Sequence, residues 1–326
     1  MKKLSIGLYA AVTVALMIWG FYQAIYVAPN DAMQGEIFRI LYYHVPSWAV
    51  VFTFFAVSFV GSIGFLASRR DHFDRAQVFD ALAVAGAEVG LVFCTVGLTT
   101  GPLWGRRAWG IWWTWDARLT TSLVLWLIYV SYLLLRHFAA GPQMQSLAAV
   151  LGIFGALDVP IVYMSNRWWR TQHPAPVFGG ATGSGMAWPM MQVFLWNMVA
   201  WFAWGVMVLI LRYYVERHRQ QMAAHEADLA LRKSESADSE FAVETNTILN
   251  RFIVPLAIVY AFALFGCAYL WATHPPAYAV SIEQILDHHF VVAAYTVTWT
   301  IQLSYLTWLG LKWTSQIPTA QRSDRI

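Results

Sequence analysis

The residues best suited to chemistry lie in one segment, 104–120, which reads WGRRAWGIWWTWDARLT. Indole faces can stack on a large ring, glycine allows close backbone approach, and guanidinium groups can pair with carboxylates in a bidentate geometry. The segment therefore predicts a shelf for a large, flat, anionic ligand. The residues assigned to this shelf are Trp104, Arg106, Arg107, Trp109, Trp112, Trp113, Trp115, Asp116 and Arg118.

An aromatic belt is the alternative interpretation of the same segment. Tryptophan collects at membrane interfaces because an indole has an apolar body and one polar N–H. A belt accounts for one or two tryptophans per loop, but less well for five that are interleaved with three arginines. The sequence leaves two roles for Asp116, which either orients Arg118 or Arg107 or neutralises excess positive charge.

The composition indicates the elements that must position these residues. Of the 326 residues, 59% are apolar and 12% are charged, whereas soluble domains have about 45–50% and about 25%. The apolar residues form blocks long enough to cross a bilayer, which takes roughly 20 residues each. We therefore predict an all-α, polytopic integral membrane helix bundle. The expected spans are 4–27, 45–68, 78–101, 119–135, 145–164, 187–211, 251–272 and 289–311.

A polar segment with alternating charge, 213–250, divides the predicted bundle. It indicates a cytoplasmic helix and linker between a six-span core, 1–212, and a two-span extension, 251–326. The first apolar stretch is too long for a signal peptide, so we expect an uncleaved span. The small net charge of +3 says nothing about nucleic acid, which we do not expect as a partner, and the two cysteines form no CxxC or CxxCH motif.

The lysines and arginines predict the orientation of the spans. If Lys2 and Lys3 lie inside, alternate loops place 15 of the 21 cations inside and six outside. Because cations favour the cytoplasmic side, both termini are expected to be cytoplasmic. The tryptophan segment then faces outward, together with a second aromatic and basic segment whose Trp168 and Trp169 are expected to contact the same ligand.

Three motifs in this order resemble a known family. WGIWWTWDARLT is similar to the WWD signature of the haem-handling membrane proteins of cytochrome c maturation, and its DARLT ending resembles the haem exporter protein C (CcmC) branch. RILYYHVPSWA and DVPIVYMSNRWWRTQHP resemble the two histidine segments of the same branch. The resemblance covers about residues 20–212. The last span is somewhat similar to the single-span partner CcmD at Tyr295, Trp299 and Tyr305, with an unrelated packing hairpin as the alternative.

The resemblance implies that His44 and His173 are the two axial ligands of haem iron, and the predicted topology places both on the side of the tryptophan segment. Neutral imidazole is a common axial ligand, although a lone interfacial histidine more often serves as a hydrogen-bonding residue. Topology also leaves His274, His288 and His289 on that side. Glu88, within the third span, is expected either to act in function or to form an interhelical hydrogen bond.

The resemblance further implies a non-enzymatic function at the bacterial inner membrane. The chain is expected to bind haem b non-covalently at the periplasmic face and to pass it to a CcmE-type haem chaperone. A CcmA/CcmB-type ABC transporter and a CcmD-like subunit are the other implied partners. The alternatives are a component like CcsA or CcmF that attaches haem directly to apocytochrome c and, more distantly, a small-molecule transporter.

Overall fold

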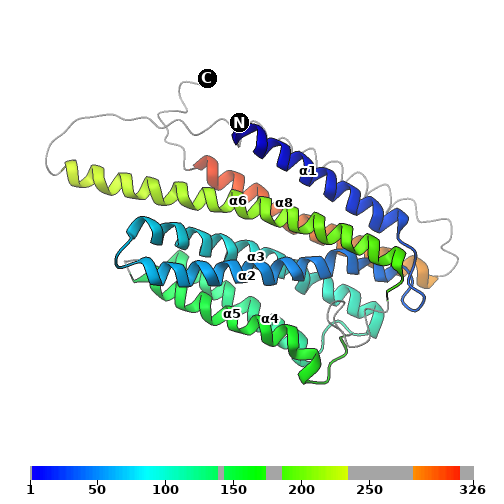
Figure 1. Cartoon of the computed structure of the whole chain (residues 1–326). Helices are drawn as coiled ribbons and strands as arrows, with labels where there is room; N and C mark the ends of the chain where they lie inside the picture. Colours follow the sequence, from blue (N-terminus) through cyan, green and yellow to red (C-terminus); the bar gives the residue numbers. More distant parts are fainter. Residues whose placement is uncertain (1, 139–142, 174–185, 234–281, 316–326) are drawn as a thin grey trace.

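The computed structural model describes residues 2–138, 143–173, 186–233 and 282–315, and Figure 1 shows the arrangement of its helices. Within these ranges the chain is mostly helical, and β pairing is limited to one isolated bridge between Asp31 and Gly35. The elements are α1 (Lys2–Tyr22), η1 (Gln23–Val27), η2 (Glu36–Ile40), α2 (Leu41–Ser68), α3 (Phe73–Trp109), α4 (Ala117–Phe138), α5 (Met144–Trp168), α6 (Trp188–Lys233) and α8 (Ile282–Ser315).

The predicted all-α membrane fold is confirmed. Among the described residues, the six helices α1 to α6 are long and apolar enough to cross a membrane. The predicted span 251–272 lies outside the described residues. The predicted span 289–311 falls within α8, whose 34 residues are sufficient in length for a crossing, but α8 is not among the six helices that are also apolar enough. That this helix crosses, and that both termini are cytoplasmic, stay predictions.

The helices lie side by side with their long axes roughly aligned (Figure 1). α3 is central, since it contacts α2, α4, α5, α6 and α8. α2 packs most extensively against α3, and glycines make this close approach possible. A Cβ added to Gly61 would lie 2.6 Å from the Ala83 nitrogen, and one added to Gly86 would lie 2.7 Å from the Phe54 oxygen. Small residues at such interfaces let membrane helices pack closely.

Two helices extend beyond their predicted ends at the tryptophan side of the bundle. α3 continues past Pro102 and Gly105 to Trp109, and Gly110 ends it in the left-handed conformation at φ 80°. α5 continues through Pro160 to Trp168, four residues beyond the predicted end of the span at 164. A proline inside a membrane helix is tolerated where neighbouring groups satisfy the backbone.

At the opposite end of α3, a buried network of ion pairs connects the helices. Arg136 binds Asp80 through two contacts, of 2.7 and 2.9 Å. Arg212 lies 2.8 Å from Glu88 and 3.0 Å from Glu216. The position predicted to end the core, 212, therefore falls in the middle of α6, within a stretch that still packs against α3.

α8 belongs to the same packed body. Tyr305 donates a hydrogen bond of 2.8 Å to Glu88, so this buried carboxylate connects α3, α6 and α8. The Tyr295 hydroxyl donates to the Arg39 carbonyl at 2.9 Å, and the Trp204 indole donates to Gln302 at 3.1 Å. Glu88 was expected either to act in function or to form an interhelical hydrogen bond, and its contacts with Arg212 and Tyr305 are interhelical.

Candidate ligand-binding site

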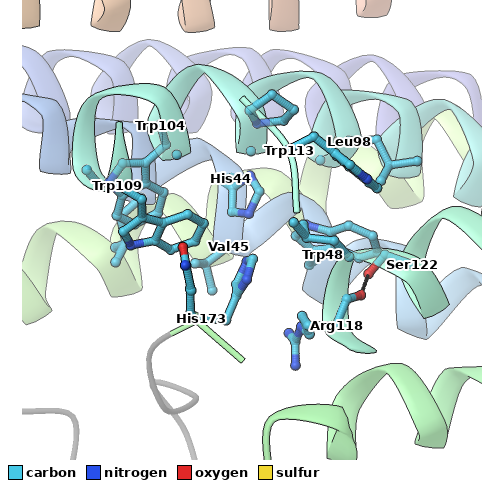
Figure 2. A pocket seen from close by; sticks show the side chains of 18 of the residues that line it. His44, Val45, Trp48, Leu98, Trp104, Trp109, Trp113, Arg118, Ser122 and His173 are labelled. Atoms are coloured by element: carbon cyan, nitrogen blue, oxygen red, sulfur yellow. Dashed lines mark hydrogen bonds between the residues drawn. The ribbon is translucent and has the colours of Figure 1, made fainter. Parts of the chain in front are cut away.

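A cavity of about 320 Å³ lies where α2, α3, α4 and the segment after α5 meet. This volume is in the range of small-molecule sites, which are about 300–1,000 Å³. Six of the residues predicted from the sequence line it: His44, Trp104, Trp109, Trp113, Arg118 and His173. Figure 2 shows their side chains around one common space.

Three tryptophans of the predicted shelf form part of the cavity wall. Trp104 and Trp109 project from the last turns of α3, and Trp113 follows Gly110 in the irregular connection to α4. The Trp104 indole donates a hydrogen bond of 2.7 Å to Gln34, which fixes its orientation. The Trp109 ring meets the His173 ring edge to face, with the centroids 5.1 Å apart.

His44 is held on the first turn of α2. It is buried, and its Nδ1 lies 2.8 Å from the hydroxyl of Thr100 on α3. Its ring packs edge to face against Trp104, with 5.8 Å between centroids, and approaches Trp48 one turn further along α2. A Cβ on Gly101 would come within 3.3 Å of the ring, so α3 leaves just enough room for it.

His173 is held on the segment that follows α5. Its backbone N–H donates to the Thr171 hydroxyl oxygen at 3.1 Å, and this hydroxyl donates to Asp116 at 2.8 Å. Its Nδ1 is buried and has no hydrogen-bond partner within the described part of the chain. Burial, and secondarily the charge of Arg118, lower the pKa of His173 to about 4, so its imidazole is neutral at physiological pH.

Asp116 has a role that the sequence did not predict. One carboxylate oxygen accepts the Leu119 N–H at 2.9 Å and so caps the N-terminus of α4. The other accepts the Thr171 hydroxyl and therefore connects the tryptophan segment to the His173 segment. Burial alone would raise the pKa of Asp116, but these hydrogen bonds hold it below its usual value.

The three arginines of the tryptophan segment lie in different environments. Arg118 lines the cavity and donates to the carbonyls of Val162 and Tyr163 on α5. Arg106 donates to the Gly110 carbonyl, outside the cavity lining. Arg107 forms an ion pair of 2.6 Å with Asp287 on α8. Arg118 is therefore the arginine that the structure brings to the two histidines.

Four predicted tryptophans do not line this cavity: Trp112 and Trp115 of the shelf, and Trp168 and Trp169 of the second aromatic segment. All four are more than half exposed. Trp112 instead meets Phe290 of α8, with 5.9 Å between centroids. Among the alternative histidines, His288 is buried at 3.1 Å from Glu36, and His274 lies outside the described residues.

The sequence did not reveal the residues that hold the histidines and Trp104 in place. Gln34, Thr100 and Thr171 carry no motif of their own, and single threonines in apolar helices are common. Trp48 had a usable signal, because it stands four residues after His44 in RILYYHVPSWA and so shares its helix face.

Residues 1–228 match the family model described as CcmC: Heme exporter protein C. The chain belongs to this family. Among its relatives, Heme exporter protein C of Bradyrhizobium diazoefficiens is 39% identical over 178 residues. Heme exporter protein C of Escherichia coli K12 is 36% identical over 161 residues, and that of Paracoccus denitrificans is 32% identical over 217 residues.

The matches to these Heme exporter protein C relatives leave part of each chain uncovered. They span 53%, 48% and 66% of this chain, and 65%, 60% and 86% of the respective relatives. The relatives from Bradyrhizobium diazoefficiens and Escherichia coli are thus matched over less than two thirds of their length. The match to the family model includes His44, the tryptophan segment and His173 but ends before α8.

Proposed function

We propose that this protein binds haem at the outer face of a bacterial inner membrane and passes it on during cytochrome c maturation. The observation that carries the proposal is the shared cavity. His44 from α2 and His173 from the segment after α5 are 129 positions apart in sequence, yet both line it. Membership of the Heme exporter protein C family supports the same ligand.

The chemistry of the cavity suits haem. Two neutral imidazoles supply axial ligands of the type that haem iron takes. Trp104, Trp109 and Trp113 supply apolar and aromatic surface for the macrocycle, and Arg118 supplies a cation for a propionate. The buried Nδ1 of His173 without a partner marks a polar group that a ligand would satisfy.

The function we propose is transfer rather than catalysis. Haem b would be held non-covalently, with the exposed tryptophans Trp112, Trp115, Trp168 and Trp169 around the mouth of the site. A CcmE-type periplasmic chaperone would accept the haem, and a CcmA/CcmB-type transporter and a CcmD-like subunit would complete the assembly. Arg106 and Arg107 were predicted to bind propionates as well; their contacts make Arg118 the stronger candidate for this role.

Haem titration of the purified protein tests the proposal. We expect the wild type to bind haem and to give a visible spectrum with two axial nitrogen ligands. His44→Ala and His173→Ala should each lose that spectrum, whereas His225→Ala, which removes an exposed histidine from distal α6, should keep it. Failure of the wild type to bind added haem would refute the function, and an unchanged spectrum in both cavity variants would refute the axial assignment.

A transfer assay separates the proposed function from direct attachment to a cytochrome. Haem-loaded protein is mixed with purified chaperone or with apocytochrome c, and haem is followed on each. Transfer to the chaperone alone supports the proposal, and covalent attachment to apocytochrome without the chaperone supports the CcsA- or CcmF-like alternative.

A further inference from the structure

Thr100 on α3 has a hydrogen-bond arrangement that decides which nitrogen of His44 carries a proton. The Thr100 hydroxyl oxygen lies 2.8 Å from the Val96 carbonyl and 2.8 Å from the Nδ1 of His44. A hydroxyl has one hydrogen to donate, whereas its oxygen can accept. A carbonyl can only accept, so the hydroxyl hydrogen is directed to Val96 and the oxygen faces His44 as an acceptor.

This arrangement fixes the state of the imidazole. With Thr100 as acceptor, Nδ1 must be the donor, and in a neutral imidazole the second nitrogen, Nε2, then carries the lone pair. We propose that Thr100 is a positioning residue, which keeps His44 in the tautomer whose Nε2 can bind iron. The inference deepens the proposed function, because it names the residue that prepares one of the two proposed ligands.

The surroundings of His44 make its tautomer depend on the hydrogen bond between Nδ1 and Thr100. The ring is enclosed by Trp104 and Trp48 at 5.8 and 6.4 Å between centroids, and both are aromatic neighbours rather than acceptors for Nδ1–H. Gly101, next to Thr100 on α3, lies so close that a Cβ there would be 3.3 Å from the Cε1 of the ring. Because a buried donor without a partner is costly, loss of the hydroxyl would disfavour the tautomer protonated at Nδ1 and so favour the one protonated at Nε2.

The Thr100 contact has two expected consequences for ligand binding. A ligand histidine held in the correct tautomer needs no rearrangement, and partners of this kind are worth about 10–100-fold in metal affinity. The hydrogen bond from Nδ1–H also makes the imidazole a stronger electron donor, which stabilises the ferric over the ferrous state. Thr100 should therefore affect both the affinity for haem and its midpoint potential.

The test compares Thr100→Val with Thr100→Ser and Thr99→Val in the purified full chain. Valine keeps the shape of threonine and removes the acceptor, whereas serine keeps the hydroxyl. Thr99 is the matched control, since it neighbours Thr100 on α3 and donates only to the helix carbonyls of Thr95 and Val96. We expect Thr100→Val to bind haem at least about 10-fold more weakly and with a higher midpoint potential, and both other variants to resemble the wild type.

Nitrogen-15 NMR of the haem-free protein with labelled histidine supplies a readout without ligand. We expect His44, identified by its loss in His44→Ala, to be protonated at Nδ1 in the wild type and in Thr100→Ser. Protonation at Nε2 in the wild type, or an affinity and potential of Thr100→Val equal to those of Thr99→Val, would overturn the role of Thr100. Absence of haem binding by the wild type would instead refute the proposed function.

Discussion

His44 and His173 line the same cavity, but the chain holds them in different ways. The His44 ring is fixed on a helix by a hydrogen bond to Thr100 and by two tryptophans. His173 is fixed through its backbone, and its Nδ1 has no hydrogen-bond partner in the described residues. The difference suggests a division of work in which His44 is the permanent ligand and His173 is the one exchanged during transfer.

The largest expected effect is an asymmetry between the two histidine variants. We expect His44→Ala to weaken haem binding about 100-fold and His173→Ala about 10-fold, or about 2.7 and about 1.4 kcal/mol. The His44 ring is preorganised by its hydrogen bond to Thr100, whereas no hydrogen bond within the described residues holds the Nδ1 of His173. Haem titration of both variants beside His225→Ala measures this. An equal loss, or a greater one for His173→Ala, would contradict the division of work.

The pH dependence of His173 sharpens the same comparison. Its pKa is depressed to about 4, first by burial and then by Arg118, while Asp116 partly opposes the shift. As pH falls from about 6.5 to about 4, the unfolded chain takes up a proton that the folded chain does not, so the contribution of His173 to stability falls across that window and stays at its lowered level below it. Above it, His173 is neutral in both states and contributes no pH dependence.

Haem binding through His173 should require its imidazole to be neutral, so the affinity should depend on pH near the pKa of this residue. In a His44→Ala background we expect binding to stay constant from pH 7.5 down to about 5 and to fall toward pH 4. Adding Arg118→Met removes the nearby cation and should raise the midpoint of that profile by about one unit, whereas Asp116→Asn should lower it. A midpoint that moves the opposite way in either variant would show that these charges do not act on His173.

The connection from Asp116 to Thr171 should matter for His173 alone. Thr171→Val removes the hydroxyl that accepts the His173 N–H and donates to Asp116. We expect about 5-fold weaker haem binding, or about 1 kcal/mol, because one buried hydrogen-bonded connection is lost. Thr114→Val is a suitable control, since that hydroxyl contacts the same carboxylate at 3.3 Å. If Thr171→Val weakened binding as much in a His173→Ala background, its effect would not pass through His173.

The sequence predicted the parts of this site that depend on residue type and topology. Apolar runs predicted the six helices α1 to α6, and the motifs identified His44, His173 and the tryptophan segment. The sequence could not separate Arg118 from Arg107, since both look like free cations until α8 places Asp287 beside one of them. Nor could it show the link from Thr171 to Asp116, which joins positions 55 residues apart and depends on where α5 ends.

The smallest expected effect concerns α8, which lies beyond the matched family segment and touches the outer part of the tryptophan segment. Asp287→Asn removes the ion pair with Arg107. The Arg107 side chain is 24% exposed and that of Asp287 is 16% exposed. A partly exposed pair is worth at most about 1 kcal/mol, so we expect a fall in unfolding temperature of about 2 °C and almost unchanged haem binding. Because Trp112 also packs on Phe290, the helix should stay in place without the ion pair. A loss of haem binding as large as that of Thr171→Val would show that α8 holds the cavity residues in place. The two histidine segments would then not be sufficient to preorganise the site.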